Sequence, residues 1–136
     1  MAKLNEAKFI TAMADELKAQ GMTVEISTVV SGMQADLIAT YPATDQRLVF
    51  EVKTTSGKPS FTTLGQVTRV RDAVLMQDPN SDQSKTMSIF ITSQELEPDL
   101  ERYAEKLDIH VIKSDGSGNV AEVVKEALGT IQERLN

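Results

Sequence analysis

The chain has 136 residues, of which 40% are hydrophobic and 25% charged, and this composition predicts a single globular domain over residues 1–136 rather than a disordered chain. The absence of cysteine excludes a disulfide scaffold and thiolate metal sites, and the net charge of −6 argues against broad, non-specific binding of nucleic acid. The N-terminus becomes charged at once and no apolar run reaches membrane-spanning length. We therefore expect a cytoplasmic protein with no membrane partner.

The first half of the chain predicts one helix followed by three strands. Apolar residues at helical spacing predict a helix over residues 3–20, which Gly21 ends. Residues 22–30 are rich in β-branched side chains and predict a strand. Two further apolar runs predict strands at 35–41 and 47–55, joined by a tight turn at Pro42.

The second half predicts alternating helices and strands. The expected elements are a helix at 61–76 capped by Ser60 or Thr62, a strand at 87–92, a helix at 98–107, a short strand at 109–112 and an amphipathic C-terminal helix at 119–135. The apolar stripe of the last helix favours core packing over a homodimer seam. The order αβββαβαβα predicts a three-layer α/β sandwich with a mixed central sheet of about five strands.

The run Leu48–Lys53 is unusual because an apolar strand carries an acid and a base. Glu51 and Lys53 are two residues apart and project from the same face. Asp36 adds a third charge inside the neighbouring apolar strand. Leaving one buried charge without compensation costs several kcal/mol, so such a strand pairs its charges, binds a metal or borders an active site.

The hairpin can bring these three residues to one face in two registers. If Tyr41 lies opposite Gln46, Asp36 lies opposite Glu51; if Ala43 lies opposite Gln46, Asp36 lies opposite Lys53. The intermediate register would place Asp36 on the other face. An exposed ion pair at a sheet end is the structural alternative, and the apolar Phe50 and Val52 argue against it.

Other candidates carry weaker signals. His110 is the single histidine and lies in a short apolar strand, which favours a place in the core or at a sheet edge over catalysis. Lys58, Arg69 and Arg71 are candidates for phosphate contacts, with a solvated surface as the alternative reading for the arginines.

The order of elements and motifs resembles the PD-(D/E)xK nuclease superfamily, nearest to its Mrr-like and Holliday-junction-resolvase-like branch. The resemblance covers roughly residues 6–112 and includes Asp36, the Glu51-Val52-Lys53 triplet and Gln66 on the following helix. It implies a restriction-endonuclease-like fold, with Asp36 and Glu51 as metal ligands, Lys53 as the catalytic lysine and Gln66 as a further active-site residue.

The first helix departs from the family pattern. Ile10 stands where the family often carries an acid, and Glu6, one helical turn earlier, is the candidate replacement as a metal ligand. Carboxylate oxygens suit Mg²⁺ or Mn²⁺.

Two functions follow from the sequence. The first is a Mg²⁺-dependent nuclease that hydrolyses DNA phosphodiester bonds, with a homodimer expected because one small chain offers a single site. The second is a catalytically inactive member of the fold that binds nucleic acid or a protein, which the acidic balance and Ile10 favour.

Overall fold

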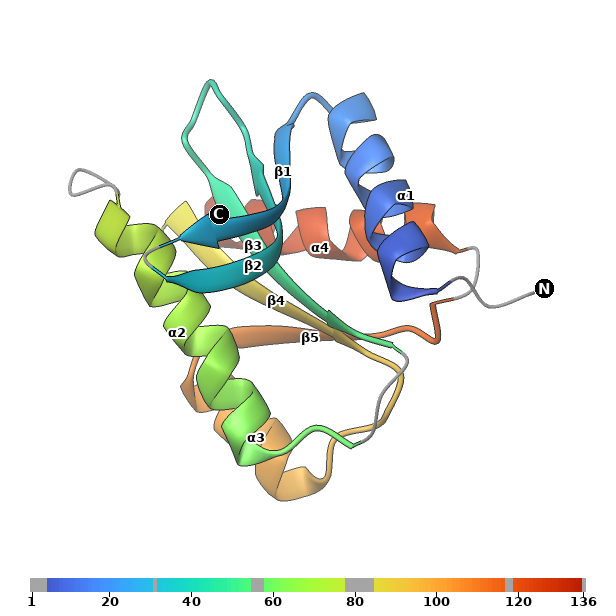
Figure 1. The fold of residues 1–136 in the computed structure, drawn as a ribbon, viewed down its shortest axis with the longest axis vertical. Coiled ribbons are helices and arrows are strands. Elements are labelled where there is room, and N and C mark those ends of the chain that lie inside the picture. Colours follow the sequence, from blue (N-terminus) through green and yellow to red (C-terminus); the bar gives the residue numbers. More distant parts are fainter. Residues whose placement is uncertain (1–4, 31, 55–57, 78–84, 117–118, 136) are drawn as a thin grey trace.

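The computed structural model describes residues 5–30, 32–54, 58–77, 85–116 and 119–135, with side chains up to residue 131. Its element order is the one expected from the sequence (Figure 1). The elements are α1 (Glu6–Ala19), β1 (Thr23–Val30), β2 (Met33–Thr40), β3 (Arg47–Lys53), α2 (Phe61–Gln77), β4 (Thr86–Thr92), α3 (Pro98–Lys106), β5 (Ile109–Lys113) and α4 (Val120–Leu135).

The described strands form one mixed sheet in the spatial order β1-β2-β3-β4-β5. The first three strands pair antiparallel and the last three pair parallel. Helix α2 connects β3 to its parallel neighbour β4, and helix α3 connects β4 to its parallel neighbour β5. Both connections therefore move in the same direction across the sheet. Right-handed crossovers in one direction place their helices on one face, and α2 and α3 do share a face (Figure 1).

Two apolar layers cover the sheet. Helices α1 and α4 bury one face, where Phe9, Leu17 and Phe50 are fully enclosed. Helices α2 and α3 bury the other, over Val49 and Phe90. Both faces of β4 are covered, and all seven of its residues are buried. The predicted three-layer sandwich is therefore confirmed, and the stripe of α4 packs into the core as expected.

Local chemistry sets the helix ends. The Asn5 side chain accepts a hydrogen bond of 2.8 Å from the Lys8 N–H, so α1 begins at Glu6 rather than at the expected residue 3. Gly21 follows the helix with φ of +90°, a conformation that favours glycine. Ser60, not Thr62, caps α2 by accepting from the Thr63 N–H at 3.3 Å.

The strand boundaries shift by one or two residues. Strand β2 starts at Met33 instead of residue 35, because its pairing with β1 continues to Val30. Strand β3 ends at Lys53, and the expected end at residue 55 lies outside the described residues. His110 lies half-buried on the edge strand β5, which confirms its expected place at a sheet edge. None of the helices in the described ranges has the length and apolar character of a transmembrane segment.

Candidate active site

The β2–β3 hairpin adopts the first of the two predicted registers. Leu37 pairs with Phe50 and Thr40 with Arg47, and the Tyr41 N–H donates to the Gln46 carbonyl at 2.9 Å. Continued by one step, this register places Asp36 opposite Glu51. Strand alternation then puts Lys53 on the same face as both carboxylates.

A backbone hydrogen bond fixes the Asp36 carboxylate over β3. The Val52 N–H donates to Asp36 Oδ2 at 2.8 Å. This amide lies between Glu51 and Lys53 in the sequence, so the bond holds the Asp36 side chain across the strand that carries the other two residues. A charged acceptor makes such a bond stronger than one between neutral groups.

Burial and like charge perturb both carboxyl groups. Burial raises the pKa of Glu51 from 4.5 to about 8, and the charge of Asp36 adds to the effect. Burial also raises the pKa of Asp36 above its ordinary value, while the bond from Val52 opposes the shift. The pair therefore holds a proton near neutral pH, because burial and mutual repulsion disfavour two neighbouring anions.

One oxygen of this pair has no partner. Glu51 Oε1 is buried and accepts no hydrogen bond among the described residues. A buried polar atom left unsatisfied costs about 1–3 kcal/mol, so the position is one at which a ligand would relieve strain in the folded state. Carboxylate oxygens on adjacent strands are hard donors that suit Mg²⁺ or Mn²⁺. The donor set fits such a cation.

The donor set is nevertheless small. Among the described residues no group of three or more His, Cys, Asp or Glu side chains is close enough to hold a metal ion. Mg²⁺ keeps several waters and commonly takes one or two protein carboxylates together with substrate phosphate. Asp36 and Glu51 alone meet that requirement.

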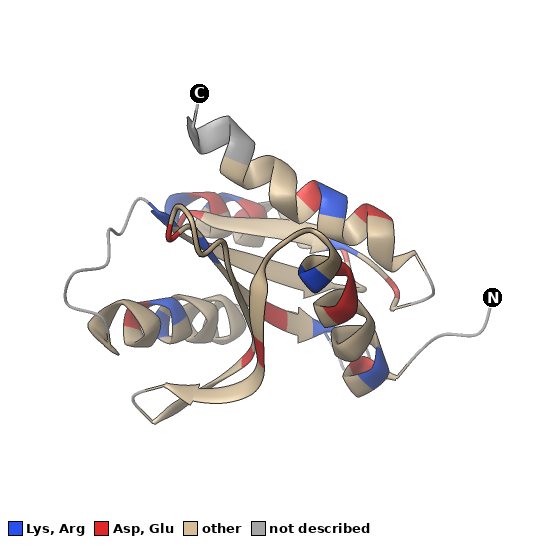
Figure 2. Cartoon of the chain, turned by 90° about the horizontal axis from the view of Figure 1, so that it is seen from above, with Lys and Arg blue, Asp and Glu red and all other residues tan. Residues whose placement is uncertain are grey.

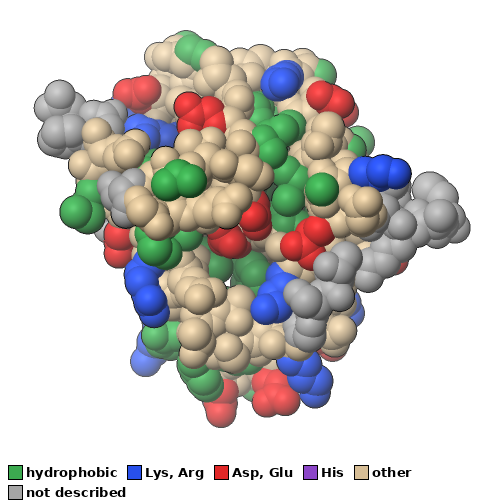
Figure 3. All heavy atoms as spheres, in the orientation of Figure 1, with side chains coloured by type: hydrophobic (Ala, Val, Ile, Leu, Met, Phe, Trp, Pro, Cys, Tyr) green, Lys and Arg blue, Asp and Glu red, His purple; other side chains and the backbone are tan. Residues whose placement is uncertain are grey.

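Lys53 completes the charged face at the end of β3. Its side chain is half-buried. Seen from above, acidic positions lie on the strands near the middle of the sheet, and one strand carries a basic position next to an acidic one (Figure 2). The space-filling view shows acidic side chains gathered in a hollow over β2 and β3, with a basic side chain next to them (Figure 3).

Helix α1 contributes through Glu6 and not through Ile10. Glu6 is half-buried in the first turn, and its negative charge raises the pKa of both Asp36 and Glu51. Ile10 is 8% exposed and belongs to the core beneath α1 and α4. The apolar residue therefore packs the fold, while the acid one turn earlier lies close enough to influence the carboxylate pair.

The remaining candidates lie on the surface or connect parts of the fold. Gln66, Lys58 and Arg69 are exposed, and no hydrogen bond joins the Gln66 amide to either carboxylate in the described part of the chain. Arg71 was a phosphate-contact candidate, but its Nη1 donates to the Leu107 carbonyl at 3.1 Å and ties α2 to the end of α3. The sequence did not predict that the Val52 N–H would hold Asp36 in place, because every residue except proline carries such a backbone donor.

No protein-family model and no curated protein matches the chain, whereas several solved structures match it in fold. A repair endonuclease from Pyrococcus abyssi aligns over 85% of this chain and 49% of its own, with a TM-score of 0.64 and 13% identity. EndoMS in complex with double-stranded DNA aligns over 88% of this chain and 48% of its own, with a TM-score of 0.62 and 11% identity.

The fold is restriction-endonuclease-like. A third structure, Can2 from Sulfobacillus thermosulfidooxidans in complex with cyclic tetra-adenylate, aligns over 92% of this chain and 35% of its own, with a TM-score of 0.66 and 16% identity. The chain thus spans about half the length of the two endonucleases and a smaller share of Can2. TM-scores of 0.62–0.66 show a fold in common with these three structures, and identities of 11–16% carry no residue-level assignment.

Proposed function

We propose that this protein is a metal-dependent nuclease that hydrolyses DNA phosphodiester bonds, with Asp36 and Glu51 as ligands of Mg²⁺ or Mn²⁺. The proposal rests chiefly on one observation: two half-buried carboxylates face each other across the hairpin, and Glu51 Oε1 has no partner among the described residues. The endonucleases of the same fold support the reaction class.

Each residue of the hairpin has a distinct task in this proposal. The cation, when bound, supplies Lewis-acid polarisation of the phosphate and a more acidic water. The Val52 N–H holds Asp36 in position. Lys53 donates a hydrogen bond to a phosphate oxygen as negative charge develops there, while the water oxygen bonds to phosphorus and the ester P–O bond breaks. The attacking water releases its proton to solvent, and the leaving oxygen takes up a proton from solvent.

The outer residues have supporting tasks. Glu6 would bind the cation through an intervening water or by a change of rotamer, and Gln66 would orient the water or the phosphate backbone. Lys58 and Arg69, both exposed, would contact phosphates along the strand. We further propose a cytoplasmic homodimer of the Mrr-like and Holliday-junction-resolvase-like type, since two such sites are needed to cut both strands of a duplex at once.

A second candidate function is a catalytically inactive module that binds nucleic acid or a protein. The net charge of −6 and the lack of a third close carboxylate in the described part of the chain favour it. The fold is compatible with either function, because function is determined by the site and not by the architecture.

A metal titration separates the two functions. The nuclease hypothesis expects calorimetry to detect Mn²⁺ binding by the native chain, loss of binding in Asp36→Asn and Glu51→Gln, and retention in Lys53→Ala. Cleavage is assayed with Mn²⁺ at low salt on linear duplex, single-stranded and branched DNA, with Lys8→Ala as a matched control on the exposed face of α1. Folded protein that binds no Mn²⁺ and cuts none of these substrates would establish the inactive module instead.

A further inference from the structure

The free edge of the sheet at β5 forms a second recognition surface. In the sheet of described residues, β5 has β4 on one side and no strand on the other. Such an edge presents backbone N–H and C=O groups that can pair with another extended chain. This edge is two strands away from the hairpin that carries Asp36 and Glu51.

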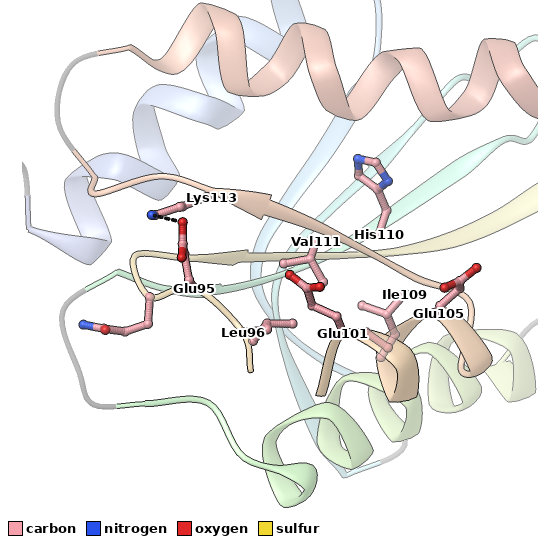
Figure 4. A pocket seen from close by; sticks show the side chains of 10 residues that line it. Glu95, Leu96, Glu101, Glu105, Ile109, His110, Val111 and Lys113 are labelled. Atoms are coloured by element: carbon pink, nitrogen blue, oxygen red, sulfur yellow. Dashed lines mark hydrogen bonds and ion pairs between the residues drawn. The ribbon is translucent and has the colours of Figure 1, made fainter. Parts of the chain in front are cut away.

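A groove follows the edge of β5. A cavity of about 510 Å³ is lined by the consecutive residues Ile109, His110 and Val111, together with Leu96 and Ala104. Consecutive strand residues point to opposite faces, so a cavity that touches all three must lie along the edge itself. Figure 4 shows this arrangement, with Ile109 and Val111 toward α3 and His110 toward α4.

The groove extends in both directions along the strand. A cavity of about 190 Å³ shares Ile109 and His110 with the first, and another of about 510 Å³ shares Lys113 with it. Because β5 has five residues, each rising roughly 3.3 Å, the groove accompanies some 17 Å of strand edge. That length suits a short extended peptide.

The walls of this β5-edge groove are strongly acidic. On the α3 side, Glu101 and Glu105 lie one helical turn apart, with Glu95 on the preceding loop (Figure 4). The remaining carboxylates of the lining are Asp108, Asp115, Glu122 and Glu126. Among the described residues that line the groove, Lys113 is the single lysine or arginine, and its Nζ is already paired with Glu95 at 3.0 Å.

We propose that the β5-edge groove binds a basic, extended segment of a partner protein, which adds to the sheet as a sixth strand. The open edge supplies main-chain hydrogen bonds and the apolar floor accommodates aliphatic parts of side chains. The carboxylates on both walls select lysine and arginine and repel the phosphates of nucleic acid. The groove is therefore a protein-docking site, separate from the proposed nuclease site.

A labelled peptide in which arginine alternates with valine tests the charge selection. Fluorescence anisotropy should detect its binding to the native chain, with an affinity that falls as salt rises. The paired variant Glu101→Gln, Glu105→Gln should weaken binding about tenfold. The matched control Asp15→Asn, Glu25→Gln removes the same charge from exposed positions outside the groove and should change binding less than about twofold. Equal losses in both variants would overturn the proposal.

Two further measurements test the strand pairing. Two peptides are compared, one N-methylated on the odd-numbered amides and the other on the even-numbered amides. Their affinities for the chain should differ, because only one of the two sets of amides faces β5 in an added strand. Hydrogen exchange of residues 109–113 should slow when the peptide binds. Equal binding by both methylated peptides with no protection of β5 would overturn the proposal. Slow exchange of residues 109–113 in the peptide-free chain that increases with protein concentration would also overturn it, because it would show that β5 pairs with a second copy of the chain.

Discussion

Replacing Glu51 with glutamine should stabilise the metal-free protein, and the gain should grow with pH. The folded state holds a proton on Glu51 up to about pH 8, whereas the unfolded chain releases it near pH 4.5. Between these values the folded state binds more protons, so its free energy of unfolding falls as pH rises. Glutamine is an uncharged group of similar shape and removes this dependence.

The size of the effect follows from the pKa shift. Between the pKa of Glu51 in the unfolded chain and its pKa in the folded chain, each pH unit lowers the free energy of unfolding by about 1.4 kcal/mol. The native chain therefore loses up to about 3 kcal/mol of this free energy between pH 4.5 and pH 7. Solvent at the partly open site screens the charges and makes this an upper value. We expect the free energy of unfolding of Glu51→Gln to be about 1–3 kcal/mol higher than that of the native chain at pH 7, and nearly equal to it near pH 5.

Urea unfolding in EDTA at a series of pH values measures the difference directly. Glu25→Gln, at an exposed position of β1, is the matched control and should follow the native curve. Addition of Mn²⁺ should restore stability to the native chain and leave Glu51→Gln unchanged. Parallel curves for the native chain and Glu51→Gln from about pH 5 to about pH 8 would refute the reasoning, because they would show that Glu51 is not perturbed.

Four further outcomes are expected. Lys53→Ala should lower the rate of DNA cleavage by about 10²–10³-fold in single-turnover assays without weakening Mn²⁺ binding, because the amine acts on charge that develops only in the transition state. Asp36→Asn should abolish Mn²⁺ binding in calorimetry yet keep the fold by circular dichroism. Glu6→Gln should lower the pKa of Glu51 in an NMR titration, since one repelling charge is removed. Phe50→Ala should destabilise the chain by about 3–5 kcal/mol in urea unfolding, as its ring is fully enclosed between the sheet and helices α1 and α4.

The sequence by itself determined the element order and the common face of Glu51 and Lys53. Both follow from periodicity: a strand alternates every second residue, so Glu51 and Lys53 had to share a face. Helix ends were predictable where a side chain supplies the cap, as at Ser60, and where only glycine tolerates the backbone, as at Gly21.

Tertiary structure decided what periodicity leaves open. Two registers satisfied the pattern, and the Tyr41 turn selected the one that sets Asp36 opposite Glu51. The raised pKa of Glu51 arises because burial and the charge of Asp36 act at the same point in space. Glu6 comes near Asp36 and Glu51 only because α1 packs against the sheet. The β5-edge groove is formed by elements that lie far apart in the sequence. Local residue patterns specify which side chains share a face, but only long-range packing fixes the distances and burial that give those side chains their chemistry.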